Sequence, residues 1–226
     1  MHLVLLDIDG TLLRTGGAGR ESLDEAFLAC FGWEDATRGV YIAGSTDGAI
    51  LRDVAARLGP FDEEALRAAY LVALERRVAV PGRVELCPGV QGLLDALDGR
   101  AHLGLLTGNW RAGASVKLRA AGLDIFSFGA YGDDAIDRNA LVPIARSRAP
   151  AHDRVIVIGD TPADVRCARA GGAFAVAVET GFATPEELAQ AGPDLQIPDL
   201  LKGTGWVVAL STPPSEVPCS SSVSMS

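Results

Sequence analysis

The sequence has few of the residues and patterns that mark several common classes of enzyme and binding protein. Its 226 residues include only two lysines, Lys117 and Lys202, and neither follows a glycine, so the chain lacks a nucleotide-binding P-loop. The four cysteines form no CxxC pair and no Cys/His spacing typical of a zinc site. No GxSxG segment occurs, which excludes the usual serine nucleophile of α/β-hydrolases.

Long apolar runs are also missing. Asp7 interrupts the N-terminal apolar stretch too early for the hydrophobic region of a signal peptide, and no run approaches the roughly 20 residues of a membrane-spanning helix. We therefore expect reduced thiols and a cytoplasmic location. The formal net charge of -9 repels nucleic-acid phosphates and anionic membranes, so we expect neither as a partner.

Two regions of different pattern follow one another along the chain. A short buried strand is expected at residues 2–7, and residues 15–82 then show helical periodicity without a convincing strand. From residue 83 onward, segments typical of strands, among them 127–131, alternate with helical ones, among them 139–149, which predicts a parallel sheet covered by helices. Helix starts are expected at the N-cap residues Asp62 and Thr161. We therefore predict an α/β fold, a Rossmann-like doubly wound parallel sheet with an inserted all-helical cap domain.

The composition, 48% hydrophobic and 22% charged, suffices for a full core and a smaller second domain. The predicted catalytic core comprises residues 1–14 and 83–210, and the cap comprises residues 15–82. Residues 211–226, rich in proline and serine, are expected to form a disordered tail.

Polar residues follow three of the predicted strands, at residues 2–7, 101–106 and 154–158. These residues are Asp7 and Asp9, then Thr107, Gly108 and Asn109, and finally Asp160 and Asp164. Ligands of parallel sheets bind beyond the carboxyl ends of the strands, so we expect these groups to share one crevice. Two carboxylates about 4 Å apart repel by roughly 4 kcal/mol at an effective dielectric constant near 20, so several together require a cation or bound protons. Ligation by oxygen atoms alone favours Mg²⁺.

Two simpler interpretations of the N-terminal segment fit poorly. "DIDGTL" begins like a calcium-binding EF-hand loop, but Leu12 stands where that loop needs glycine and Ala18 where it needs glutamate. "GGAG" at residues 16–19 does not directly follow a strand, so it is a weak indication of a dinucleotide site.

The ordered set "DIDGT" (7–11), "TGN" (107–109) and "GDTPAD" (159–164) resembles the haloacid dehalogenase superfamily. It looks like the Mg²⁺-dependent phosphatase branch, in which a helical cap is inserted after the first motif, and the resemblance covers about residues 1–200. It implies hydrolysis of a phosphomonoester of a small phosphorylated metabolite, with phosphoglycolate as the leading candidate.

The resemblance also implies roles for individual residues. Asp7 would attack phosphorus and form an aspartyl-phosphate, and Asp9 would act first as the acid and then as the base. Mg²⁺ would be held by the Asp7 carboxylate, the Asp9 backbone carbonyl and Asp160, with Asp164 supporting the site through waters. The phosphoryl oxygens would be held by Thr107 and by the amides near Gly108 and Asn109.

One departure from the superfamily pattern concerns its third motif, which usually supplies a lysine shortly before a helix. The corresponding stretch here, "DRNALVP" (137–143), contains no lysine. We predict that Arg138 takes its place, because a guanidinium can pair with both Asp7 and phosphate oxygens. Arg146 is the alternative, although it lies well inside the predicted helix.

The cap offers further candidates for contact with the substrate. Ser45 and Thr46 lie in "AGSTD" (43–47), which resembles the substrate-facing cap loop of related enzymes, although it could instead only cap a helix. Arg20 is a weaker candidate for binding a substrate anion, and its alternative is an ordinary solvated charge on a helix.

Other functions stay open at this point. A phosphoglucomutase-like phosphotransferase shares the same motifs, whereas a 2-haloacid dehalogenase is disfavoured because that branch lacks the second aspartate, present here as Asp9. A phosphoryl-accepting regulatory domain of the receiver type would be shorter and would lack a cap. A non-catalytic binding module is a further alternative. For the oligomeric state, we expect either a monomer or a small homo-oligomer.

Overall fold

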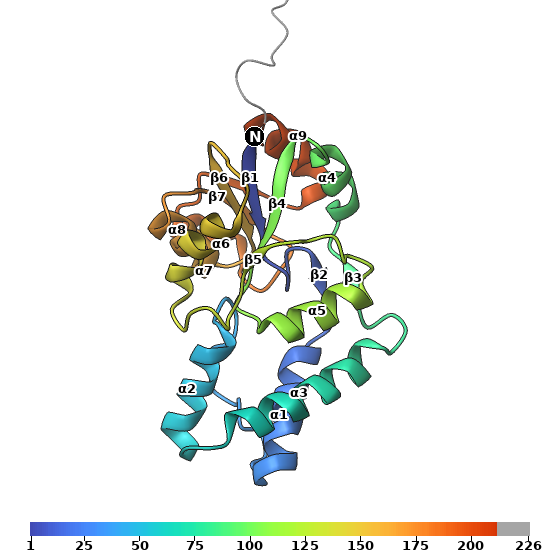
Figure 1. Cartoon of the computed structure of the whole chain (residues 1–226), viewed down its shortest axis with the longest axis vertical. Helices are drawn as coiled ribbons and strands as arrows, with labels where there is room; N and C mark the ends of the chain where they lie inside the picture. Colours follow the sequence, from blue (N-terminus) through green and yellow to red (C-terminus); the bar gives the residue numbers. More distant parts are fainter. Residues whose placement is uncertain (212–226) are drawn as a thin grey trace, which may run out of the picture.

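The computed structural model describes residues 1–211, and a parallel six-stranded sheet lies at its centre in the order β5-β4-β1-β6-β7-β8 (Figure 1). The strands are β1 (His2–Leu6), β4 (Ala101–Leu106), β5 (Gly129–Ala130), β6 (Val155–Gly159), β7 (Phe174–Val178) and β8 (Leu195–Ile197). Because β1 pairs in parallel with both β4 and β6, the segments that follow these three strands meet at one edge of the sheet.

Strand β1 is buried along its whole length, because helices cover both faces of the sheet. Val4 and Leu6 belong to the hydrophobic cluster on one face, and Leu3 and Leu5 belong to the cluster on the other. This burial explains why the strand is apolar without alternation, and it makes β1 a rigid support for the residues that follow it.

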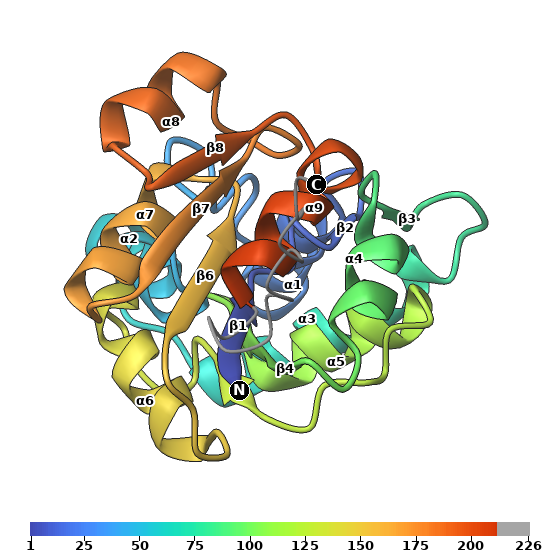
Figure 2. The same cartoon turned by 90° about the horizontal axis from the view of Figure 1, so that it is seen from above.

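Two layers of helices enclose the sheet (Figure 2). The cluster around Val4 includes residues of α4 (Val90–Leu97), α5 (Arg111–Ala120) and α9 (Leu200–Ser211). The opposite cluster includes residues of α6 (Leu141–Arg148), α7 (Pro162–Ala170) and α8 (Pro185–Ala191), and a short 3₁₀ helix, η1 (Arg138–Ala140), leads into α6.

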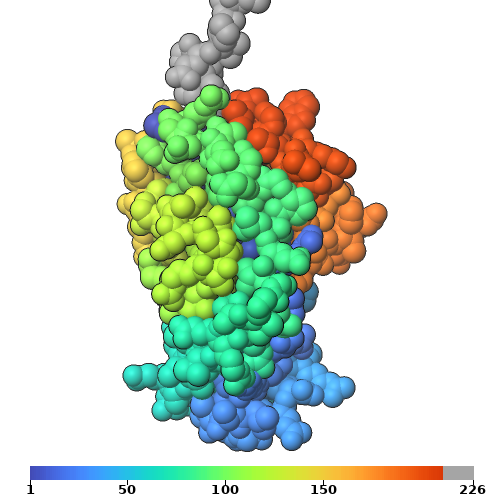
Figure 3. Space-filling model, turned by 90° about the vertical axis from the view of Figure 1, so that its right-hand side faces the viewer, coloured from blue at the N-terminus to red at the C-terminus, as the bar shows by residue number. Residues whose placement is uncertain are grey.

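The cap contains the helices α1 (Ala18–Phe31), α2 (Asp47–Leu58) and α3 (Glu63–Val78) and has a hydrophobic core of its own. Its two connections to the rest of the chain pass through β2 (Leu13–Arg14) and β3 (Glu85–Leu86), which pair antiparallel. In the space-filling view the cap, coloured blue to teal, forms a separate lower lobe (Figure 3). The domain boundaries expected from the sequence fall at or next to these paired strands.

The predicted fold class is confirmed, and so are several helix starts. Asp62 accepts hydrogen bonds from the first amides of α3, and Thr161 and Asp164 form the capping box of α7. The predicted strand at 127–131 is shortened to the two residues of β5, and the predicted helix at 139–149 begins as η1. β8 and α9 were not predicted as separate elements.

Residues 212–226, which make up almost all of the predicted tail, lie outside the described residues. Within residues 1–211, no helix combines the length and the apolar character that crossing a bilayer requires.

Candidate active site

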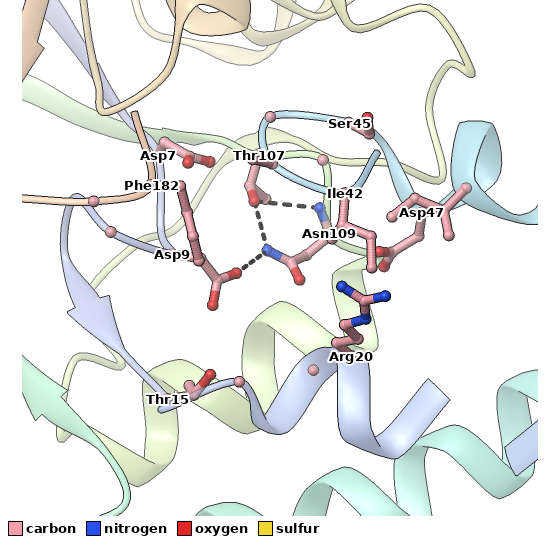
Figure 4. Close-up of a pocket in the computed structure, with 18 of the residues that line it drawn as sticks. Asp7, Asp9, Thr15, Arg20, Ile42, Ser45, Asp47, Thr107, Asn109 and Phe182 are labelled. Atoms are coloured by element: carbon pink, nitrogen blue, oxygen red, sulfur yellow. Dashed lines mark hydrogen bonds between the residues drawn. The ribbon is translucent and has the colours of Figure 1, made fainter. Parts of the chain in front are cut away.

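A cavity of about 550 Å³ lies between the carboxyl edge of the sheet and the cap (Figure 4). The core contributes Asp7, Asp9, Thr107, Gly108, Asn109 and Arg138 to its lining, and the cap contributes Arg20 and Ser45. The structure therefore brings together most of the residues that the sequence indicated, although they come from segments up to 131 positions apart in the chain.

Asp7 is placed by the end of β1 and by the turn that follows it. Its backbone N–H donates to the carbonyl of Ile158 at 3.0 Å, which extends the pairing of β1 with β6. Gly10 adopts a φ of 86°, and a Cβ there would lie 2.5 Å from Asp160 Oδ2. Glycine is therefore required at this turn, both for its backbone conformation and for the close approach of Asp160.

Three buried carboxylates gather next to this turn. Asp7, Asp160 and Asp164 each present an oxygen, and these oxygens all lie within 4.8 Å of one another. Burial raises the pKa of Asp7 to about 7, and the Arg138 charge opposes this shift. Burial, followed by repulsion from Asp164 and Asp7, raises the pKa of Asp160 well above its usual value. The cluster thus holds more negative charge than its surroundings can stabilise.

Arg138 supplies the only positive charge in direct contact with this cluster among the described residues. Its Nη2 lies 3.1 Å from Asp7 Oδ1 and also donates to Asp164, while Nη1 donates to the cap carbonyl of Gly44 at 3.3 Å. The buried Nε has no partner within residues 1–211. Arg146, the alternative considered from the sequence, is exposed and donates to the carbonyl of Gly171.

The acidic cluster fits a bound Mg²⁺. Three carboxylates and one guanidinium leave two negative charges, which equals the charge that a divalent cation would neutralise. Asp164 has both oxygens occupied, Oδ2 by Thr161 and Oδ1 by Arg138, so it is better suited to hold its neighbours than to bind a metal directly. The donor set consists of oxygen atoms only, as Mg²⁺ prefers.

Asp9 lies outside this cluster and belongs to a second polar network. Its Oδ2 accepts from Lys117 Nζ at 2.6 Å and from Asn109 Nδ2 at 2.7 Å. Asn109 also donates to Thr107 Oγ1 at 2.9 Å and accepts from Lys117 Nζ at 2.7 Å. Two N–H donors on Oδ2 therefore fix the orientation of the Asp9 carboxylate, and its Oδ1 has no partner among the described residues.

The sequence analysis missed Lys117 as a site residue. It lies on α5, and only 3% of it is exposed. Its neighbours on the helix, Ala114 and Leu118, are buried apolar residues. A lysine on the apolar face of a helix, in a chain with only two lysines, is the sequence feature that could have indicated a buried charge. Such a buried ammonium group requires a partner, which here is Asp9.

The cap loop before α2 contacts the core directly. The Asp47 amide donates to the carbonyl of Gly108 at 2.8 Å, and the Asp47 carboxylate accepts from the Trp110 amide at 2.7 Å. A Cβ at Gly108 would lie 2.1 Å from the carbonyl oxygen of Ser45, so this approach requires glycine. Burial raises the pKa of Asp47 to about 6. Asp47 was also missed from the sequence.

The three cap residues expected to bind substrate are placed differently. Ser45 lines the cavity, and its hydroxyl donates to the carbonyl of Tyr41. Thr46 is not among the lining residues, because its hydroxyl caps α2 and donates to the carbonyl of Ile136 in the core. Arg20 lines the cavity with its guanidinium held by two hydrogen bonds to Thr37.

Comparison with known proteins finds a relative that matches part of the chain. A phosphoglycolate phosphatase from Synechococcus elongatus is 36% identical over 125 residues, which cover 53% of this chain and 59% of that protein. The chain thus matches less than two thirds of the length of this relative.

Solved structures show the same fold at low sequence identity. A hydrolase from Pseudomonas syringae has a TM-score of 0.71 at 23% identity, and the likeness covers 93% of this chain and 99% of that one. CbbY from Rhodobacter sphaeroides, in complex with phosphate, has a TM-score of 0.74 at 20% identity, covering 90% of this chain and 96% of that one. The family model "haloacid dehalogenase-like hydrolase" matches residues 1–172, and the chain therefore belongs to that family, as its ordered motifs indicated.

Proposed function

We propose that this protein is a Mg²⁺-dependent phosphomonoester hydrolase that acts on a small phosphorylated metabolite. The observation that carries the proposal is the position of Asp7. It lies at the end of the central strand, lines the cavity, contacts Arg138 at 3.1 Å and shares a buried acidic cluster with Asp160. Membership of the hydrolase family and the phosphoglycolate phosphatase relative support the same reaction class.

In the proposed reaction, an Asp7 carboxylate oxygen attacks phosphorus while the ester P–O bond breaks. Asp9 gives a proton to the departing alcohol oxygen. In the second half, Asp9 takes a proton from water, the water oxygen attacks phosphorus, and the Asp7 carboxylate is released together with inorganic phosphate. Hydrolysis of phosphate monoesters is so slow in water that acceleration of up to about 10²¹-fold is needed, and a covalent intermediate divides this barrier into two lower ones.

Other residues of the cavity orient the phosphoryl group. The unpartnered Nε of Arg138 is a donor for a phosphoryl oxygen, and Thr107 with the backbone near Gly108 and Asn109 surrounds the opposite side. The ion pair with Lys117 and the hydrogen bond from Asn109 hold the Asp9 carboxylate in place. A fixed acid/base group needs no reorientation during the reaction.

Asp7, Asp160 and the Asp9 backbone carbonyl would hold Mg²⁺, with Asp164 positioned behind them. When bound, the ion would neutralise negative charge on Asp7 and on the phosphoryl oxygens. The repulsion that raises the pKa values of Asp7 and Asp160 would decrease in its presence.

Phosphoglycolate is a candidate substrate because it appears in the name of the relative. Free thiols at Cys30, Cys87 and Cys167 support a reducing, cytoplasmic setting. We favour hydrolysis over phosphotransfer, because the structural neighbours described as phosphoglucomutases share only about a fifth of their sequence with this chain and so indicate the fold alone.

The test is release of inorganic phosphate from p-nitrophenyl phosphate with Mg²⁺. Asp7→Asn should lower the rate by about 10⁴-fold or more, because an amide cannot act as the nucleophile. Asp124→Asn, which removes an equal charge from an exposed position, should leave the rate unchanged. EDTA should stop the reaction and Mg²⁺ should restore it. Retained activity in Asp7→Asn, or activity that EDTA does not affect, would contradict the proposal.

A further inference from the structure

The cap side of the cavity has an apolar lining, which a reaction at phosphorus does not require. The apolar residues that line it from the cap are Leu23, Val40, Ile42, Ile50 and Tyr70. All of them belong to the cap's hydrophobic core or pack against it. This wall is rigid and offers few hydrogen-bonding groups, so it suits an apolar ligand better than a sugar or a small acid.

Two exposed aromatic residues stand at the same cavity. Phe182 follows β7 and is 66% exposed, and Tyr41 belongs to the cap loop and is 68% exposed, yet both line the cavity. The backbone amide of Phe182 donates to Asp160 Oδ2 at 2.9 Å, which fixes its loop to the acidic cluster. Phe182 is drawn in Figure 4 among the residues that line the cavity. An aromatic ring held next to the site and left open to solvent is a ready contact for an apolar ligand.

The cavity is also larger than phosphoglycolate, the candidate substrate named above. Phosphoglycolate has nine non-hydrogen atoms, which would occupy at most roughly 270 Å³ if each took as much space as a water molecule in the liquid. The cavity measures about 550 Å³. About half of it would therefore remain for groups other than phosphoglycolate.

The cations of the cavity are largely committed to protein partners. Lys117 is paired with Asp9, Arg138 with Asp7 and Asp164, and Arg20 lies 4.0 Å from Asp24. The remaining one, Arg14, donates through Nε and Nη2 to the carbonyl of Thr180. A second anionic group such as the carboxylate of phosphoglycolate would have to compete for these cations.

From these observations we propose that the alcohol part of the substrate is a ring-sized, largely apolar group that packs against the cap wall and Phe182. This inference rests on the proposed phosphatase activity and names its substrate class: phosphomonoesters of aromatic or alicyclic alcohols, in preference to phosphoglycolate. The ester oxygen would face Asp9, and the ring would lie between Phe182 and the apolar residues of the cap.

The kinetic test compares 2-phenylethyl phosphate with ethyl phosphate and phosphoglycolate in the presence of Mg²⁺. The first two esters are both phosphates of primary alcohols, so their reactivity is similar and the ring is the main difference. We expect kcat/KM to be about tenfold or more higher for the phenylethyl ester, mainly through a lower KM. Equal values for the phenylethyl and ethyl esters, or a preference for phosphoglycolate, would overturn the inference.

Substitution of Phe182 tests whether its ring makes the contact that favours the phenylethyl ester. Phe182→Ala should reduce the ratio of kcat/KM values between the phenylethyl and ethyl esters by about fivefold or more, because part of the ring contact is lost. Trp206→Ala is the matched control: Trp206 is also 66% exposed, but it lies on α9 at the opposite end of the molecule from the cap (Figure 1). An unchanged ratio in Phe182→Ala, or an equal decrease in Trp206→Ala, would contradict the assigned contact.

A binding experiment separates this inference from the proposed function. Calorimetry with 2-phenylethylphosphonate and ethylphosphonate, neither of which can be hydrolysed at phosphorus, measures the ring contact without turnover. About tenfold tighter binding of the phenylethyl compound supports the apolar site even if no ester is hydrolysed, a result that would refute the phosphatase proposal alone. Equal binding of the two phosphonates refutes the apolar site whatever the outcome of the activity assays.

Discussion

The two walls of the cavity differ in how their side chains are held. On the core side, polar groups hold one another: Asp7 contacts Arg138, which contacts Asp164, which in turn caps α7 through Thr161. On the cap side, most lining groups are apolar, and the polar side chain of Ser45 contacts only the backbone of its own loop.

This difference indicates that the core wall carries out the reaction and the cap wall selects the substrate. Groups that carry out chemistry must stay within a fraction of an ångström of the correct position, and networks of mutual hydrogen bonds achieve this. An apolar wall recognises size and shape instead, and it tolerates exchange of one aliphatic residue for another. Substitutions in the core network should therefore affect kcat and stability, whereas substitutions in the cap wall should affect the choice of substrate.

After Asp7, the largest effect within the core network is expected at Arg138. Arg138→Ala should lower kcat/KM by about 10²-fold or more and reduce the free energy of unfolding by about 3–5 kcal/mol, because it leaves Asp7 and Asp164 buried without their counter-ion. Phosphatase kinetics and chemical denaturation measure the two effects.

Arg146→Ala is the control for this prediction, because Arg146 is exposed and forms only one long hydrogen bond to a carbonyl. We expect it to resemble the wild type in both assays. If Arg146→Ala caused the loss and Arg138→Ala did not, the assignment of the third motif to Arg138 would be wrong.

A smaller effect is expected at Lys117. Lys117→Met keeps the length and the apolar part of the side chain but removes the charge that holds Asp9. We expect kcat to fall by about 10- to 100-fold, within the range for loss of positioned acid–base catalysis, while KM changes by less than about threefold.

The chain provides a matched control in its other lysine. Lys202 is exposed on α9, so Lys202→Met should leave kcat and KM unchanged. Lys117→Arg should recover part of the lost kcat if the charge next to Asp9 is what matters. A larger change in KM than in kcat would instead place Lys117 in direct contact with the substrate.

The sequence predicted the core network better than the contacts between core and cap. Asp7 and Asp160 could be found because each directly follows a buried strand, and Asp9 because it lies in the turn after the first of these strands. The position of a residue at a strand end is a local property. The helix starts at Asp62 and Thr161 were predictable for the same reason.

Features that depend on tertiary packing could not be predicted in this way. Lys117 reaches Asp9 only because of the face that α5 turns toward the site, and Asp47 meets Trp110 only because the cap folds back onto the core. Strand β8 has only three residues, too few for a periodic pattern. Thr46 is next to Ser45, which lines the cavity, but the hydroxyl of Thr46 joins the cap loop to the core.

The smallest effect is expected at Asp47, the one lining residue of the cap whose carboxylate is bound to the core backbone. Burial raises its pKa to about 6, above the value of about 4 expected in the unfolded chain, so the folded protein holds a proton in this pH range that the unfolded chain has lost. The contribution of Asp47 to the free energy of unfolding should therefore fall as pH rises, by about 1 kcal/mol between pH 5 and pH 7.5.

Asp47→Asn removes the titrating group while its amide oxygen can still accept from Trp110. Chemical denaturation at pH 5 and pH 7.5 should therefore show a smaller decrease in stability for this variant than for the wild type, by about 1 kcal/mol. Asp53→Asn, at an exposed position on the same helix, should keep the pH dependence of the wild type. Identical pH dependence in wild type and Asp47→Asn would mean that Asp47 is not buried between the cap and the core, and it would contradict the buried contact between its carboxylate and the Trp110 amide.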